Sequence, residues 1–158
     1  MIGGTRPMRE CSLDRGADIV DWKYFEETRA QLGTGFVKIL GYFREDGQAS
    51  LAKIEAAMHA RDTVALIIPA HTLKGESRQF GAEPLAAVAE RIEFAARSCV
   101  EQGRFPDELV PDVVKLKELF RVTLEQFDEA VSPLVKRERA VGFGSRGVRN
   151  TTFGRASG

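Results

Sequence analysis

The residues best suited to chemistry in this chain are His71, Lys74 and Gly75. Lys74 follows His71 by three positions and Gly75 follows it by four. Residues at positions i, i+3 and i+4 of a helix are neighbours on one face. The pattern therefore predicts an imidazole with an ammonium group beside it and an open space where a side chain would otherwise lie. Because glycine inside a helix costs about 0.5–1 kcal/mol relative to alanine, we expect Gly75 to allow another molecule to approach His71 closely.

Further residues share this predicted face. At 100° per residue, Lys74 lies about −60° and Gly75 about +40° from His71. Arg78 lies at about −20°, two turns further along. Two cations beside an imidazole suit an anion. The turn before the histidine carries apolar residues that suit a docking partner, namely Ile67 and Ile68.

The opposite side of the same predicted helix is apolar. Leu66, Leu73 and Phe80 recur at intervals of seven residues. Such a repeat gathers apolar side chains on one side of a helix. We therefore expect this side to enter the core and His71 to face outward on a rigid element.

Other interpretations of the two histidines are weaker. A lone histidine on a helix is usually a surface residue, and we interpret His59 in that way. For His71 the same interpretation would leave Lys74 and Gly75 as coincidences. A metal site is not expected, because two histidines twelve residues apart, without a cysteine partner or a His-Glu-x-x-His motif, provide no ligand set.

The elements that must position these residues are helices. Apolar residues repeat at three- and four-residue steps, and no segment alternates with period two over a useful length, so we expect an all-α bundle. Asp21 is expected to cap the first helix, Asp62 or Thr63 the third, and Gly47 predicts a bend or break in the second. The expected helices cover residues 22–32, 34–59, 63–80, 83–102 and 111–135.

Composition describes an ordinary globular protein. The 158 residues are 43% hydrophobic and 29% charged, which fits one domain. The formal net charge of +0 gives no general attraction to nucleic acid or to anionic lipid. Two cysteines fit a reducing compartment, and neither a membrane span nor a secretory signal is recognised. We expect a cytoplasmic monomer that binds neither nucleic acid nor membrane.

The two ends of the chain differ from its middle. Residues 1–17 lack apolar periodicity and are expected to form a flexible arm, and residues 137–158 are expected to form a flexible tail that contains glycine and arginine. We favour an uncommitted tail over one that binds an acidic partner. Residues 18–136 form the predicted helical domain.

Around the histidine motif, the chain resembles the histidine phosphotransfer (HPt) family of two-component phosphorelays. The family pattern His-x-Leu-Lys-Gly is present at residues 71–75, followed by Gly81-Ala82 and by Leu85 on the next helix. Glu90-Arg91-Ile92-Glu93 continue the likeness, which extends from about residue 19 to residue 131. The resemblance implies an antiparallel four-helix bundle with an additional N-terminal lid helix.

The resemblance also implies roles for individual residues. His71 would carry a phosphoryl group, Lys74 would stabilise it, and Gly75 would leave room for the partner. A neutral imidazole near pH 7 is a usable nucleophile toward an acyl phosphate. By the same resemblance Glu93 and Arg97 lie near this face, with Arg97 as a secondary contact of the phosphate or the partner.

The expected partners are response-regulator receiver domains and a hybrid or sensor histidine kinase. The phosphoryl group would move to or from an aspartate of the receiver. We expect no intrinsic cofactor, because no acidic cluster shaped for Mg²⁺ accompanies His71 and the receiver would supply the metal.

Two residues depart from the family pattern. Glu76 occupies a position where the family usually has a small residue, although it lies about 140° from His71 on the helix. Pro69 removes a helical hydrogen bond and clashes with the carbonyl of Ala65. Either the helix kinks there, or its regular part begins near Ile68.

Two classes of function fit these residues. The first is a phosphocarrier that relays a phosphoryl group through His71, and the second is a helical docking module of the same fold without phosphotransfer. The intact trio of His71, Lys74 and Gly75 favours the first. An autophosphorylating kinase is not expected, because no Gly-rich nucleotide-binding segment is recognised.

Overall fold

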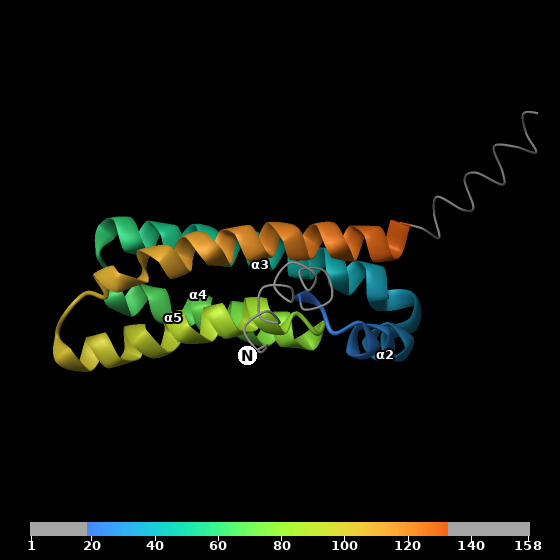
Figure 1. Cartoon of the computed structure of the whole chain (residues 1–158), viewed down its shortest axis with the longest axis horizontal. Coiled ribbons are helices and arrows are strands. Elements are labelled where there is room, and N and C mark those ends of the chain that lie inside the picture. Colours follow the sequence, from blue (N-terminus) through green and yellow to red (C-terminus); the bar gives the residue numbers. More distant parts are fainter. Residues whose placement is uncertain (1–18, 133–158) are drawn as a thin grey trace, which may run out of the picture. The chain divides into compact units, whose positions relative to one another are not determined.

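The computed structural model describes residues 19–132, and within that range the chain forms helices and no strand. The predicted arm (1–17) and tail (137–158) lie outside the described residues. Figure 1 shows the helices in chain order. They are α2 (Trp22–Leu32), the 3₁₀ turn η2 (Gly33–Gly35), α3 (Phe36–Ala60), α4 (Thr63–Gln79), α5 (Glu83–Gln102), the 3₁₀ turn η3 (Asp107–Leu109) and a last helix over residues 110–132.

Aspartate side chains begin two of these helices, as the sequence predicts. Asp21 accepts a hydrogen bond from the backbone N–H of Tyr24 at 3.1 Å and caps α2. Asp62 accepts one from Ala65 at 3.1 Å and caps α4, so the cap is Asp62 and not Thr63. Each cap satisfies a donor that the first helical turn leaves unpaired.

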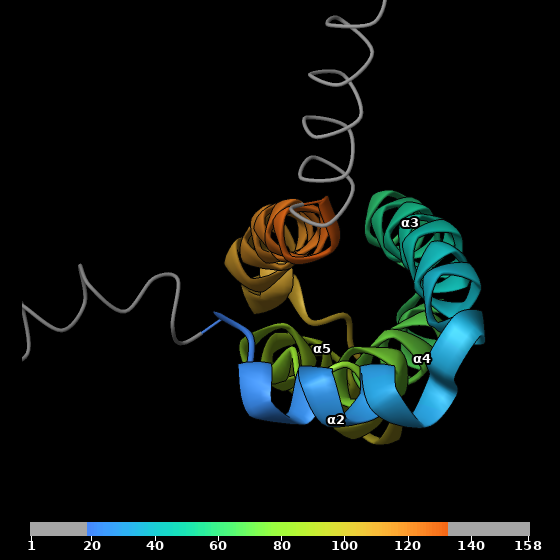
Figure 2. The ribbon, with the colours of Figure 1, turned by 90° about the vertical axis from the view of Figure 1, so that its right-hand side faces the viewer.

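Four helices form the predicted antiparallel bundle. α4 packs against both α3 and α5. The last helix lies beside α3, since the ring centroids of Phe43 and Phe120 are 5.7 Å apart. It also reaches α5 through an ion pair of 2.6 Å between Arg91 and Asp112. Figure 2 shows these helices from one end, approximately down their axes.

The predicted lid helix is α2, which lies across one end of α4 and α5 (Figure 2). The N–H of Asp21 donates to the carbonyl of Gly81 in the turn between those helices, at 2.8 Å. Gly81 has a φ of +80°, and a Cβ there would lie 2.9 Å from the Asp21 carbonyl oxygen. Glycine is therefore required both by the backbone conformation and by the close approach of α2. Edge-on contacts between the rings of Phe25 and Phe36 add apolar packing under the lid.

Gly47 does not break α3, so the prediction of a break there is wrong. The helix continues from Phe36 to Ala60, and Gly47 is buried within it. A Cβ at this position would lie 2.3 Å from a ring carbon of Phe120. The glycine is therefore explained by close packing of the last helix, which a pattern within one helix does not reveal.

Pro69 lies inside α4, which runs without interruption from Thr63 to Gln79. The alternative in which the regular helix begins near Ile68 is therefore wrong. Pro69 is buried, so its ring packs into the interior of the bundle.

None of the helices between residues 19 and 132 has the length and apolar character needed to cross a bilayer. The cytoplasmic location stays a prediction.

Candidate functional site

The core side of α4 fixes the orientation of the histidine. Leu66 and Leu73 are fully buried, and Phe80 is 1% exposed. The side chain of His71, on the other side of the helix, is 58% exposed. The prediction that the apolar side of this helix is buried and that His71 faces outward on the other side is confirmed.

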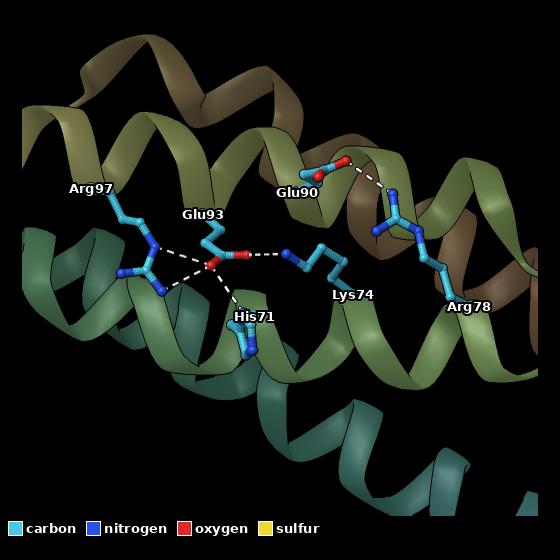
Figure 3. Close-up of polar contacts among 6 residues, drawn as sticks. All are labelled: His71, Lys74, Arg78, Glu90, Glu93 and Arg97. Carbon is cyan, nitrogen blue, oxygen red and sulfur yellow. Dashed lines mark hydrogen bonds and ion pairs between the residues drawn. The ribbon is translucent and has the colours of Figure 1, made fainter.

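A buried carboxylate from the neighbouring helix lies at the centre of the site (Figure 3). The side chain of Glu93 on α5 is 8% exposed. Its Oε2 lies 2.9 Å from Nδ1 of His71, and its Oε1 lies 2.9 Å from Nζ of Lys74. Arg97, one turn further along α5, donates to Oε2 from Nε at 3.0 Å and from Nη2 at 2.9 Å. Glu93 therefore binds the histidine and both nearby cations at once.

Glu93 is ionised throughout the neutral pH range. Burial raises the pKa of its carboxyl group, but hydrogen bonds from Lys74, Arg97 and His71 outweigh burial and lower that pKa to about 2. Because an ionised carboxylate only accepts hydrogen bonds, the proton of a neutral His71 must lie on Nδ1. Nε2 is then the nitrogen with the free lone pair, and in Figure 3 it points away from Glu93.

Two cations lie around the carboxylate that contacts the histidine, namely Lys74, as the helical spacing predicts, and Arg97, while the predicted Arg78 pairs elsewhere. Neither Lys74 nor Arg97 is free. The side chain of Lys74 is 20% exposed and that of Arg97 is 53% exposed. Both donate to Glu93, so an anion at His71 would share them with this carboxylate. Arg97 lies on the face where the family resemblance places it.

The residues predicted to contact a partner differ in their surroundings. Ile68 is 70% exposed, while Ile67 is half-buried. Arg78 is tied to α5 through Glu90 at 2.9 Å and more weakly through Glu83 at 3.5 Å. Arg78 thus joins α4 to α5, and the structure does not place it against His71 (Figure 3).

Gly75 is exposed, and a Cβ built there would meet no atom within 4 Å. Packing inside the described part of the chain therefore does not require glycine at this position. Glu76 is half-buried and turned toward α3, where burial and then the charge of Asp46 raise the pKa of its carboxyl group. Its orientation keeps this extra carboxylate away from the exposed histidine.

The family resemblance places Glu93 near the site but does not indicate its central position. The spacing of Glu93 and Arg97 is a signal for an ion pair within one helix. The pair lies opposite His71 because of how α5 is positioned along and against α4. Residue spacing within one helix does not determine this relation between two helices.

Comparisons with known proteins agree with this geometry. Residues 38–130 match the Hpt domain family. Among solved structures, the fold is similar to that of histidine-containing phosphotransfer protein B (HptB) from Pseudomonas aeruginosa PAO1, with 24% sequence identity and a TM-score of 0.64. That match covers 72% of this chain and 95% of the HptB chain, and at this identity it shows the fold alone. No curated protein matches the sequence. Because the family match covers more than half of the chain, the chain belongs to the Hpt domain family and is a histidine phosphotransfer protein of phosphorelays.

Proposed function

We propose that His71 is the phosphoacceptor and that it exchanges a phosphoryl group with an aspartate of a response-regulator receiver domain. The observation that carries this proposal is the pairing of an exposed imidazole with a buried carboxylate on Nδ1, at 2.9 Å. This contact leaves the lone pair of Nε2 directed outward, toward an incoming partner. A family member of this kind is a phosphocarrier and not a kinase.

The chemical step needs little from the chain beyond positioning and charge. The lone pair of Nε2 attacks phosphorus, an N–P bond forms, and the O–P bond of the aspartyl phosphate breaks with its electron pair returning to the carboxylate. Phosphoryl transfer of this type depends mainly on in-line geometry and electrostatic stabilisation. The reverse sequence of bond changes returns the group to an aspartate.

Two cations beside His71 support an anionic product. A phosphohistidine carries charge comparable to the roughly −1.5 to −2 of other phosphorylated side chains. We assign Lys74 to stabilising this charge, with Arg97 as a second contact, since both already lie around the carboxylate that holds the histidine. Mg²⁺ would come with the receiver.

The surface around His71 supports access by a protein partner. Gly75 leaves open space one turn from the histidine, and Ile68 offers exposed apolar area on the preceding turn. Both residues lie on the same side of α4 as His71, where a receiver would bring its aspartate. We assign partner contacts to Ile67, Ile68 and Arg97, with Arg78 at the edge of this surface.

The test follows radiolabelled phosphate into the full chain. Receiver domains charged with labelled acetyl phosphate are mixed with wild type, with His71→Ala and with His59→Ala, which removes the other of the two histidines. We expect acid-labile, base-stable label on wild type and on His59→Ala, and none on His71→Ala. Label that persists on His71→Ala would overturn the assignment. Binding of the receiver without any transfer to wild type would support the docking module instead.

A further inference from the structure

Glu76 and Asp46 form an acidic pair where α4 packs against α3, and the transfer chemistry does not use it. We propose that this acidic pair binds a lysine or arginine on the docking surface of the receiver and so selects which receivers exchange phosphate with His71. The inference rests on the proposed function, because it assigns a specificity contact to the partner of that same histidine.

The carboxylate of Glu76 lies in surroundings that do not stabilise its charge. The residue is half-buried, and its Oε1 is buried without a hydrogen-bond partner. Asp46, which is exposed, places a second negative charge beside it, and burial and then this charge raise the pKa of Glu76. Within residues 19–132, neither carboxylate forms an ion pair. The acidic pair therefore lacks the cation that two like charges at a partly buried site require for stabilisation.

The acidic pair lies toward the side of α4 from which a partner has access to His71. At 100° per residue, Gly75 lies about +40° and Ile68 about +60° from His71. Glu76 follows in the same direction at about +140°. Glu93 closes the opposite side of the histidine (Figure 3). A receiver that reaches Nε2 over the exposed Ile68 and the open space at Gly75 would therefore also meet the acidic pair.

A basic side chain of the receiver would satisfy the acidic pair. An ammonium or guanidinium group that reaches two carboxylates forms charge-assisted hydrogen bonds with them. A receiver bound there also shields the three charges from water, which strengthens their attraction. A receiver with an apolar residue at the same place would leave both carboxylates without a cation, and one with an acidic residue would add a third negative charge. The acidic pair therefore favours receivers with a basic residue at this place and rejects those with an acidic one.

Two variants each remove one charge with little change of shape, namely Glu76→Gln and Asp46→Asn. Because each relieves the repulsion within the unbound protein, we expect both to raise the denaturant midpoint of unfolding. A pair that served only the fold would lower this midpoint when it is broken. Glu45→Gln is the matched control, since Glu45 precedes Asp46 on α3, is exposed and lies about 100° away around the helix.

The experiment uses the full chain and the receiver domain that labels wild-type protein after charging with acetyl phosphate. We expect the second-order rate constant of transfer to be about tenfold lower in Glu76→Gln and in Asp46→Asn, and within about twofold of wild type in Glu45→Gln. The wild-type rate should also fall more steeply with NaCl concentration than the rate of either charge-removed variant, because salt screens the proposed contact.

Phosphoramidate serves as a control donor that has no docking surface. Its P–N bond breaks, ammonia leaves, and the phosphoryl group joins Nε2 of His71. Phosphorus NMR should therefore show equal labelling rates for wild type and all three variants.

The outcomes separate this inference from the proposed function. Transfer from the receiver to Glu76→Gln and Asp46→Asn at the wild-type rate, or an equal loss in Glu45→Gln, overturns the selection of a basic partner. A loss of transfer that phosphoramidate labelling shares, or that comes with a lower unfolding midpoint, also overturns it. If neither donor labels wild-type protein at His71, the proposed function itself is contradicted.

Discussion

At the scale of single residues, Gly75 occupies a position where packing within the described part of the chain does not require glycine. It lies inside α4, where glycine is less favourable than alanine, yet a Cβ at this position would meet no atom of residues 19–132 within 4 Å. The absence of an internal reason supports an external one, namely clearance for the partner beside His71. We therefore expect glycine at this position to lower the stability of the protein slightly and to let the partner reach His71.

Two substitutions at Gly75 test these two effects. Gly75→Ala is expected to raise the free energy of unfolding by about 0.5–1 kcal/mol, because it improves helix propensity without a clash. Gly75→Leu is expected to retain the fold and to be labelled by phosphoramidate at His71, but to lose transfer from a phosphorylated receiver. Denaturant unfolding and labelling measure these effects, and undiminished transfer from the receiver to Gly75→Leu would contradict the clearance argument.

At the scale of elements, the glycine in the middle of α3 is explained by the helix that packs against it. Glycine in the middle of a long helix usually lowers the stability of that helix. Gly47, however, is buried and lies against the ring of Phe120. That ring is itself held beside Phe43 at 5.7 Å. The missing side chain at Gly47 lets the last helix approach α3 closely.

A pair of glycines on α3 allows a matched test of this packing. Gly47→Ala is expected to destabilise the protein by about 1–3 kcal/mol, because its Cβ overlaps a buried ring. Gly41→Ala, on the same helix with open space around it, is expected to stabilise the protein by about 0.5–1 kcal/mol. Thermal or denaturant unfolding of both variants gives the comparison, and effects of the same sign would refute the packing explanation.

At the scale of the whole molecule, the ion cluster at the site also contributes to the stability of the fold. Folding lowers the pKa of Glu93 from 4.5 to about 2. A carboxyl group with a lowered pKa stabilises the folded state above its unfolded pKa, and this contribution is lost as the pH falls from about 4.5 toward 2. At about 1.4 kcal/mol for each pH unit, the contribution is on the order of 3 kcal/mol.

Acid unfolding measures this contribution. The free energy of unfolding of Glu93→Gln is expected to be lower than that of wild type at pH 7, and the difference should shrink below about pH 4.5. Glu118→Gln is a suitable comparison, because hydrogen bonding to Arg121 lowers the pKa of Glu118 on an exposed surface where solvent screens the pair. A difference between wild type and Glu93→Gln that stays constant from pH 7 to pH 3 would argue against the ion cluster as its source.

The sequence by itself determined the helices and their faces. Asp21 and Asp62 mark helix starts through side-chain caps, and the seven-residue repeat of α4 separates its buried seam from the exposed His71. These features are local, because a cap acts within one turn and a helical face follows from a constant rotation per residue. The proposal that His71 is the phosphoacceptor therefore began from local spacing, together with the family resemblance that the same residues carry.

Only the tertiary structure decided which groups from different helices meet. Glu93 binds Nδ1 of His71 across the interface between α4 and α5, Arg78 is held by Glu90, and Gly47 packs against Phe120. Each of these contacts depends on the axial register and rotation of two helices, which the packing of the entire core sets. The sequence placed a histidine on the surface, and the fold set a buried carboxylate against its Nδ1 and left Nε2 free.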